Sequence, residues 1–149
     1  MTWNFKSFEE LSKEELYAIL KERVDVFVVE QACPYPEIDG YDEQSWHLYY
    51  EDQGDIAAYC RLIPAGVMYD ESSIGRVLVK KEYRGSGLAR EMMGKAMEIM
   101  KNEWTVSRIK LHAQEYLKDF YGSFGFLPVT DVYLEDGIPH IDMIYAQKE

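Results

Sequence analysis

The stretch Val77-Leu78-Val79-Lys80-Lys81-Glu82-Tyr83-Arg84-Gly85-Ser86-Gly87-Leu88-Ala89-Arg90-Glu91-Met92-Met93 joins an apolar strand pattern to an amphipathic helix through a glycine-rich turn. Glycine has no Cβ, so the backbone of this turn can approach an anion closely. The first N–H groups of the helix that follows have no partner within the helix and point outward. Arg84 adds a fixed positive charge, and charge-assisted hydrogen bonds contribute about 1.5–3 kcal/mol each. The stretch therefore predicts a binding site for an anion such as pyrophosphate.

Two familiar phosphate-binding motifs do not fit this turn. A dinucleotide fingerprint has a third glycine at the position of Arg90 and an acidic ribose ligand after a second strand. A P-loop has Gly-Lys-Ser/Thr at the start of the helix, whereas Leu88 follows Gly87 here. An ordinary strand-to-helix turn without a ligand stays open as an alternative.

The charge of the chain is acidic overall but basic around the turn. A net charge of −11 argues against nonspecific binding to nucleic acid or to an acidic membrane surface, since both require positive potential. Two acids, Glu82 and Glu91, lie between residues 76 and 95. The bases in the same interval are Arg76, Lys80, Lys81, Arg84, Arg90 and Lys95. This local excess of positive charge favours an anionic ligand, and a solvated helix face is the simpler reading of Arg90 and Lys95.

The length and the cysteine content limit the class of protein. The 149 residues suffice for one domain with a sizeable core, and we expect a single domain over 1–149. No apolar run approaches the roughly 20 residues that span a bilayer, and the start of the chain lacks the layout of a signal peptide. We therefore expect a cytoplasmic protein, either a monomer or a homodimer. Cys33 and Cys60 lack the company of metal ligands, so we expect reduced thiols and no metal.

The periodicity of apolar residues predicts the order of helices and strands. Ser12 and Glu15 have the spacing of a capping box, and Asp136-Gly137 is a favoured hairpin pair. A stripe through Leu88 and Met92 predicts that the methionines of this helix fill the core. Expected strands are 3–8, 46–51, 56–63, 73–79, 106–112, 126–134 and 138–146, and expected helices are 12–29, 88–103 and 117–124. The order predicts an α/β domain with a mixed sheet of six to seven strands and three to four helices.

Residues 30–44 form a long loop in this prediction. The segment contains Pro34, Pro36 and Gly40, which interrupt regular structure, and loops of this length are often functional. Its acids are Glu30, Glu37, Asp39, Asp42 and Glu43. They either border a pocket that attracts a cation or form an ordinary solvated loop.

Two motifs in the second half of the chain resemble one superfamily. The turn Arg84-x-x-Gly87-x-Ala89 is similar to the acyl-coenzyme A signature of the GNAT N-acetyltransferases, and Tyr121-Gly122-Ser123-Phe124-Gly125-Phe126 is similar to their second motif. More narrowly, residues 28–42, 112–114 and 136–141 resemble the ElaA-like branch, so the likeness covers nearly the whole chain.

The resemblance implies a mostly antiparallel sheet in which the fourth and fifth strands splay apart and leave a slot for the pantetheine of acetyl-coenzyme A. The residues that it assigns to this co-substrate are Leu78, Val79, Arg84, Gly85, Ser86, Gly87, Leu88, Ala89, Gln114 and Tyr121. Two positions depart from the usual family pattern: Lys81 replaces a proline, and Gln114 replaces an asparagine. Neither departure removes the turn glycine or the tyrosine.

Direct transfer of an acetyl group to a primary amine in a ternary complex requires a base, an oxyanion donor and an acid. Only about one in 2,500 lysine-like amines is neutral at pH 7, so a group of the protein has to accept a proton. We favour His112 or Glu30 as this base, with His47 and His140 as further candidates. The resemblance assigns the oxyanion to the Val79 N–H. We assign the proton for the leaving thiolate to Tyr121, since a thiolate with a pKa of about 8.5 can draw a proton from a well-placed phenol. A plain core tyrosine stays open as the alternative.

The acceptor is less defined than the donor. We expect a small-molecule or peptide amine, bound by Gln31, Glu37, Asp39, Arg76 and His140. If Arg76 binds a carboxylate instead, the acceptor resembles an amino acid. Two other functions stay open: a non-catalytic acyl-coenzyme A binding or regulatory module, and a structural scaffold.

Overall fold

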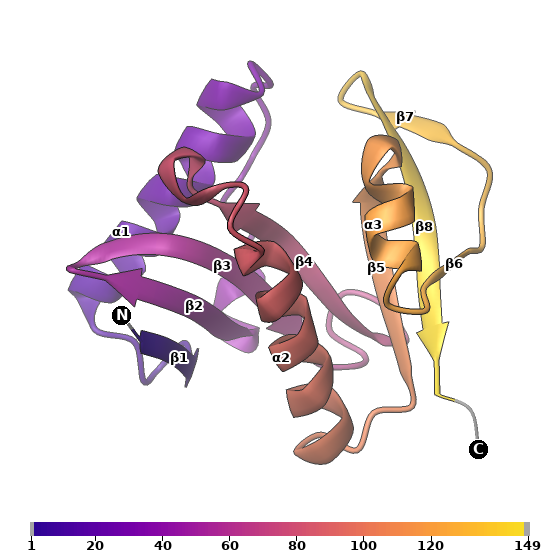
Figure 1. Cartoon of the computed structure of the whole chain (residues 1–149), viewed down its shortest axis with the longest axis horizontal. Coiled ribbons are helices and arrows are strands. Elements are labelled where there is room, and N and C mark those ends of the chain that lie inside the picture. Colours follow the sequence, from indigo (N-terminus) through magenta and orange to yellow (C-terminus); the bar gives the residue numbers. More distant parts are fainter. Residues whose placement is uncertain (1, 148–149) are drawn as a thin grey trace.

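The computed structural model describes residues 2–147 and shows a single twisted sheet with helices on both faces (Figure 1). In chain order the elements are β1 Thr2–Ser7, α1 Lys13–Val24, β2 Trp46–Asp52, β3 Asp55–Ile63, β4 Ser72–Val79, α2 Leu88–Asn102, β5 Arg108–Gln114, α3 Lys118–Gly122, β6 Leu127–Pro128, β7 Tyr133–Glu135 and β8 Ile138–Ala146.

The sheet has eight strands in the order β1-β2-β3-β4-β5-β8-β6, with β7 also paired to β8. The pair β4–β5 is parallel and the other pairs are antiparallel, which confirms the predicted α/β class with a mixed, mostly antiparallel sheet. The predicted number of six to seven strands is wrong because the expected strand 126–134 divides into β6 and β7. Pro128 has no N–H to donate to a ladder, and β6 ends there. The Val129 N–H still donates to the Asp142 carbonyl of β8 at 2.9 Å before the chain leaves the sheet.

The first helix is capped as predicted but ends differently. Ser12 accepts a hydrogen bond from the Glu15 N–H at 3.0 Å, and the Glu15 carboxylate accepts one from the Ser12 N–H at 2.8 Å. α1 stops at Val24, and the chain continues as a π-helical turn over Asp25–Glu30 in place of the continuous helix predicted to residue 29. Such turns occur often at functional sites. Here the last residue of the turn, Glu30, lies at the cavity between β4 and β5.

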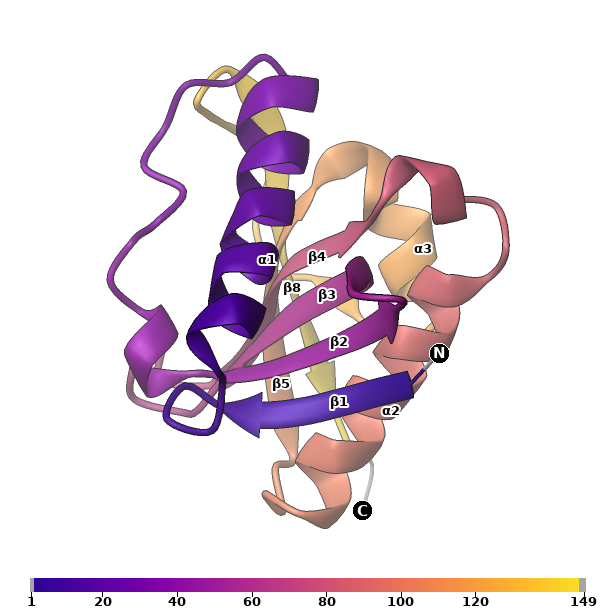
Figure 2. The same cartoon turned by 90° about the vertical axis from the view of Figure 1, so that its left-hand side faces the viewer.

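Helices α1 and α2 cover opposite faces of the sheet, as Figure 2 shows. The predicted stripe of α2 is buried: Met92, Met93 and Ala96 are fully inaccessible and pack in the larger core. On the other face Ile19 of α1 packs in a smaller cluster with Tyr59. Complete burial of one such apolar side chain contributes about 1.5–3 kcal/mol. The methionines of α2 are therefore core residues, as the sequence predicts.

A buried ion-pair network ties the long loop after α1 to the sheet. Arg23 of α1 is fully buried and donates to the Glu37 carboxylate at 2.8 Å and to the Asp42 carboxylate at 2.6 Å. Arg61 of β3 donates to Asp42 at 2.9 Å and to Asp39 at 2.8 and 2.9 Å. The loop acids thus compensate arginines that would otherwise be buried without a counter-charge.

This network predicts that the protein loses stability in acid. Burial by itself raises the pKa of Asp39, but the hydrogen bonds and charge of Arg61, the Tyr41 N–H and the charge of Arg76 together outweigh it and lower the pKa from 3.8 to about 2. The folded carboxyl therefore has a lower pKa than the unfolded one, and its stabilisation is present above about pH 4 and disappears as the pH falls toward 2. We expect the free energy of unfolding in urea to decrease from pH 5 to pH 2.5, with a smaller decrease for Asp39→Asn. Equal slopes for the two proteins would contradict this assignment.

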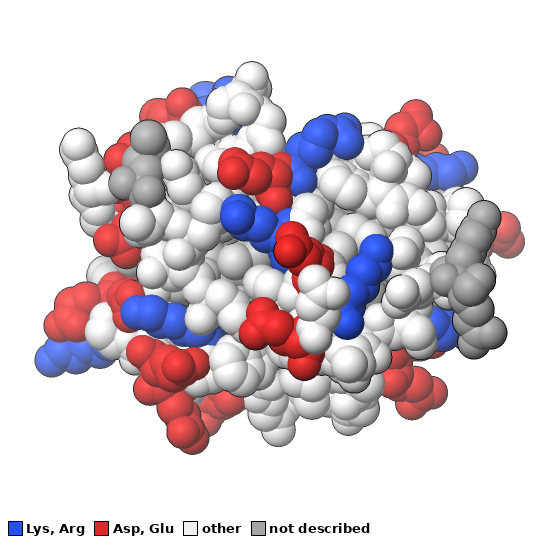
Figure 3. Space-filling model, turned by 60° about the horizontal axis from the view of Figure 1, so that its bottom comes forward, with Lys and Arg blue, Asp and Glu red and all other residues white. Residues whose placement is uncertain are grey.

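Charged side chains of both signs are mixed on one face of the molecule. Figure 3 shows acidic and basic side chains interspersed on the face drawn there. Within residues 2–147, helices of sufficient length and apolar character to cross a bilayer are absent.

Candidate active site

Strands β4 and β5 separate soon after they begin, which opens the middle of the sheet. Their pairing consists of Ser72 with Ile109 and Ser73 with Lys110. Farther along, the register of β4 with β3 shifts, and Arg76 adopts a φ of +52°. A bulge of this kind bends its strand and re-aims the backbone. The predicted splay of these two strands is confirmed, and the bulge lies in the part of β4 that no longer pairs with β5.

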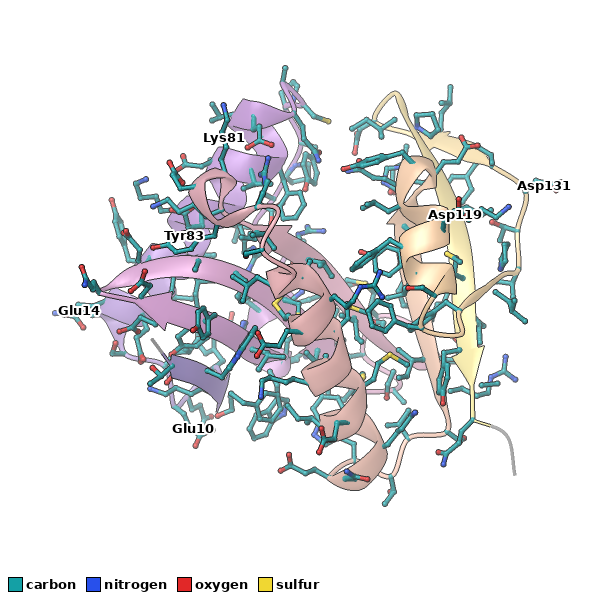
Figure 4. The ribbon with its side chains drawn as sticks, in the orientation of Figure 1. Glu10, Glu14, Lys81, Tyr83, Asp119 and Asp131 are labelled. Carbon is teal, nitrogen blue, oxygen red and sulfur yellow. The ribbon has the colours of Figure 1, made fainter. Side chains whose placement is uncertain are left out.

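A cavity of about 330 Å³ occupies the space between the separated strands. Among the residues predicted for the donor, Leu78, Val79, Arg84, Gln114 and Tyr121 line it. Among those predicted for catalysis or for the acceptor, Glu30, Gln31, Arg76, His112 and His140 line it. In Figure 4, Lys81 and Tyr83 mark the segment between β4 and α2 on one side of the opening between β4 and β5, and Asp119 marks α3 on the other side.

The turn before α2 presents an uncapped helix N-terminus to solvent. Gly87 is the N-cap residue with a φ of +81°, and no side chain caps the helix there. Gly85 also has a positive φ, +85°, and the stretch Gly85–Gly87 is exposed. Leu88 is buried and anchors the turn to the core, while Ala89 is half-buried. The free N–H groups of this fifteen-residue helix can bind an anion.

The backbone of Val79 faces the cavity. In an antiparallel ladder, hydrogen-bonded and non-hydrogen-bonded pairs alternate. The Lys80 N–H donates to the Ala57 carbonyl at 2.8 Å, so the neighbouring pair of Val79 and Ala58 is the non-hydrogen-bonded kind. The Val79 carbonyl accepts from Arg84 Nε at 2.8 Å instead, away from β3. The Val79 N–H is accordingly free of the β3 ladder and directed to the slot.

Arg84 and Glu30 form an ion pair at the border of the cavity. The guanidinium donates to both Glu30 oxygens, at 2.8 and 3.0 Å. These hydrogen bonds lower the pKa of Glu30, which makes its carboxylate a weaker base. Of the two favoured bases, Glu30 is therefore the one whose oxygens are already engaged.

Tyr121 of α3 lies in the wall of the cavity with 5 % of its surface exposed. Its ring packs edge-on against Phe120 and Phe126. Burial raises the pKa of the Tyr121 phenol, so the hydroxyl keeps its proton at neutral pH. Within the described residues it makes no hydrogen bond, which leaves that proton available to a ligand.

His112 of β5 lies in a polar cluster at the other side of the cavity. Its Nδ1 is 3.0 Å from the Asp142 carboxylate, and Tyr133 contacts the same nitrogen. Its Nε2 contacts the Glu135 carboxylate, and its ring stacks on that of His140 at 4.8 Å. An aspartate on one ring nitrogen orients the imidazole for proton transfer at the other.

Several predicted residues lie elsewhere. His47 is fully buried, contacts Tyr59 and the Asp42 carbonyl, and does not line the cavity. Glu37 and Asp39 do not line it either, because both carboxylates hold arginines. These two acids are therefore not available to bind the acceptor, contrary to the prediction from the sequence.

Arg76 reaches the cavity, but its guanidinium is also engaged. It donates to Glu37 at 2.7 Å and to Asp39 at 3.2 Å. A carboxylate of the acceptor would have to displace these partners.

Sequence reasoning missed Tyr133, Glu135 and Asp142. Asp142 lies directly opposite His112 in the β5–β8 pairing. The signal for this contact is the strand register, which spacing along the chain does not supply. Asp136-Gly137 predicts the hairpin but not the strand against which it pairs.

The fold and the site together define the class of protein. The fold of this chain, a mixed sheet that opens between two parallel strands, is similar to that of an acyl-CoA N-acyltransferase from Pseudomonas aeruginosa. The two structures superpose with a TM-score of 0.93 at 41% identity, over 97% of this chain and 99% of the other.

The chain belongs to the family described as the acetyltransferase (GNAT) domain, whose model matches residues 9–146. It is 42% identical to protein ElaA of Escherichia coli over 143 residues, 95% of this chain and 94% of that protein. The crystal structure of E. coli ElaA superposes with a TM-score of 0.91 over 97% of this chain and 99% of the other. A Schizosaccharomyces pombe relative, UPF0039 protein C11D3.02c, is 43% identical over 93% of each chain. The resemblance to the GNAT superfamily and its ElaA-like branch is thus confirmed, and it supports acyl transfer with a coenzyme A-derived donor as the class of reaction.

Proposed function

We propose that this protein is an acetyl-coenzyme A-dependent N-acetyltransferase that transfers the acetyl group directly to a primary amine in a ternary complex. The observation that carries the proposal is the slot between β4 and β5, into which the Val79 N–H is directed and whose wall contains Tyr121. Acetyl-coenzyme A supplies an activated thioester when bound. The exposed turn Gly85-Ser86-Gly87 and the N-terminus of α2 suit its pyrophosphate, and Gln114 borders the slot for its pantetheine arm.

Each step of the proposed acetyl transfer is assigned to a residue of the chain. The Val79 N–H donates to the thioester oxygen as negative charge develops there, which is the role of an oxyanion hole. Tyr121 donates its proton to the departing thiolate. We favour His112 over Glu30 as the base for the amine, because the hydrogen bonds from Arg84 lower the pKa of Glu30, whereas the carboxylates beside His112 stabilise an imidazolium. Asp142 stabilises the imidazolium that forms when His112 accepts that proton.

A cationic amine is the acceptor that we propose. The carboxylate of Glu135, half exposed, borders the cavity beside His112 and His140, and Gln31 contributes an amide that contacts Gln114 at 3.3 Å. We do not propose recognition of a carboxylate by Arg76, since Glu37 and Asp39 already compensate its charge.

The experiment that tests this function is the release of free thiol from acetyl-coenzyme A in the presence of a panel of amines and peptides. We expect release that depends on the amine. Binding of acetyl-coenzyme A without release under any of these conditions would favour the non-catalytic binding module. Failure of every coenzyme A ester to raise the melting temperature would favour a scaffold, because ligand binding to the native state has to stabilise it.

Gly87→Glu tests the placement of the pyrophosphate. The new carboxylate would lie at the proposed anion site, and we expect the affinity for acetyl-coenzyme A to fall about 10- to 100-fold, measured by calorimetry, since a charge-assisted hydrogen bond contributes about 1.5–3 kcal/mol. Gly54→Glu is the matched control, because Gly54 has nearly the same φ, +84°, in the β2–β3 hairpin. If both variants bind normally, the pyrophosphate does not lie at this turn.

A further inference from the structure

The cavity wall contains three side chains that form a candidate metal site. One ligand atom each of His112, Glu135 and His140 lies within 4.8 Å of the other two. They come from β5, β7 and β8, which the sheet brings together: His112 is two ladder positions from Gln114, the partner of His140, and Tyr133 of β7 pairs with His140.

The Nδ1 atoms of both histidines have the hydrogen-bond partners that are typical of metal-binding histidines. His112 Nδ1 is 3.0 Å from the Asp142 carboxylate, and His140 Nδ1 is 2.8 Å from the Ile138 carbonyl. A histidine that binds a metal almost always donates its other ring N–H to a carboxylate or a backbone carbonyl. With both Nδ1 atoms engaged, the Nε2 atoms are those left for a metal.

The surroundings of His112 also favour a cation at Nε2. Acceptors lie at both ring nitrogens, Asp142 at Nδ1 and Glu135 at Nε2, whereas a neutral imidazole has a single N–H. One carboxylate therefore faces a lone pair unless a second proton or a metal ion lies between them. Glu135 is half exposed on a hairpin, so its carboxylate can move outward to make room.

We propose that His112, Glu135 and His140 bind a zinc ion in the acceptor half of the cavity, with Asp142 as the residue that orients His112. Two imidazole nitrogens and one carboxylate oxygen suit zinc and not the hard cations magnesium and calcium, which prefer oxygen ligands. Bonds of about 2.0–2.2 Å place the ligands of tetrahedral zinc about 3.3 Å apart. Small side-chain rotations have to bring the three ligand atoms to that spacing, with the Glu135 carboxylate moving outward from His112 Nε2. The fourth position opens to the cavity and takes water or a ligand.

The site has a consequence that rests on the proposed function. A metal at His112 Nε2 occupies the lone pair that accepts the proton of the amine, so zinc binding and amine deprotonation exclude each other. Zinc then inhibits acetyl transfer, and a chelator restores it.

Zinc titration of the metal-free full chain tests the site without acetyl-coenzyme A or an amine. The readout is competition with a chromogenic zinc chelator near neutral pH. We expect one zinc per chain and no competition by millimolar magnesium or calcium. Asp142→Asn lowers the affinity about 10- to 100-fold, as the loss of a carboxylate that orients a metal-binding histidine usually does, and Glu135→Gln and His140→Ala lower it further.

Glu103→Gln, an exposed glutamate after α2, is the matched control and retains the affinity of the unmodified chain. If His140→Ala fails to fold, Glu135→Gln keeps the test intact, because Glu135 is half exposed. Equal zinc affinity in Glu135→Gln and the unmodified chain overturns the site. A chain that transfers acetyl groups but binds no zinc also overturns it. A chain that binds zinc but transfers nothing even after a chelator has removed the metal overturns the proposed function and leaves the site standing.

Discussion

Tyr121→Phe lowers kcat for acetyl transfer by about 10²- to 10⁴-fold and leaves the binding of acetyl-coenzyme A intact, because this range is the usual contribution of a general acid. The substitution removes one hydroxyl that has no hydrogen-bond partner within the described residues, so the fold loses little. Burial raises the pKa of this phenol above its ordinary 10.0, and the proton is therefore present at every pH at which the assay is practical. Steady-state thiol release from pH 6 to pH 9, together with calorimetric binding, measures both effects.

The control for this variant is Tyr17→Phe. Tyr17 lies on the exposed side of α1, 75 % accessible, and its hydroxyl is remote from the proposed chemistry. We expect its kcat to equal that of the unmodified chain. A normal kcat for Tyr121→Phe across this pH range would show that the thiolate takes its proton from another donor.

The turn that we propose for the donor could be predicted as a structural element from the sequence because its determinants are local. The positive φ of Gly85 and Gly87 and the burial of Leu88 depend on a few neighbouring residues, and glycine marks such positions in the sequence. The capping box at Ser12 is local in the same sense. The position of the turn, the helix after it and the methionine core of α2 therefore agree with the prediction.

The acceptor half could not be predicted because its contacts join distant parts of the chain. The bulge gives Arg76 a positive φ, which arginine adopts seldom and which only its neighbours in the sheet impose. Asp142 meets His112 through strand register. The sequence around Glu37 is typical of an exposed loop. In the structure Glu37 is buried, because it pairs with Arg23 of α1 and Arg76 of β4.

The ion-pair network also holds the loop of residues 31–44 in place beside the cavity, so the stability of the fold and the geometry of the cavity are connected. Arg23 and Arg61 are both buried and share Asp42 at 2.6 and 2.9 Å. Arg76 extends the network from Glu37 to the cavity wall. The loop that follows Gln31 is thus held by charges rather than by an apolar core of its own.

Arg23→Ala therefore lowers the free energy of unfolding by about 3–5 kcal/mol, since removal of one partner leaves buried carboxylates with less compensation. Glu37 loses its contacts at 2.8 and 3.0 Å, and Asp42 loses one at 2.6 Å. Urea unfolding followed by circular dichroism at pH 7 measures the difference. Since Glu37 also holds Arg76 beside the cavity, we expect the same variant to weaken amine binding, seen as a higher KM.

Lys21→Ala is the matched control for this loss, because Lys21 lies one half-turn earlier on α1 and pairs with Asp25 at 2.8 Å in solvent. Exposed pairs of this kind contribute about 0.3–0.5 kcal/mol. The double variant Arg23→Ala/Glu37→Ala separates the pair from its surroundings, since a coupled pair gives a combined loss smaller than the sum of the single losses. Additive losses would contradict the coupling of Arg23 with Glu37. An Arg23→Ala loss no larger than that of Lys21→Ala would contradict it as well. In either case the buried ion pairs would not hold the loop in its position, and other contacts would have to do so.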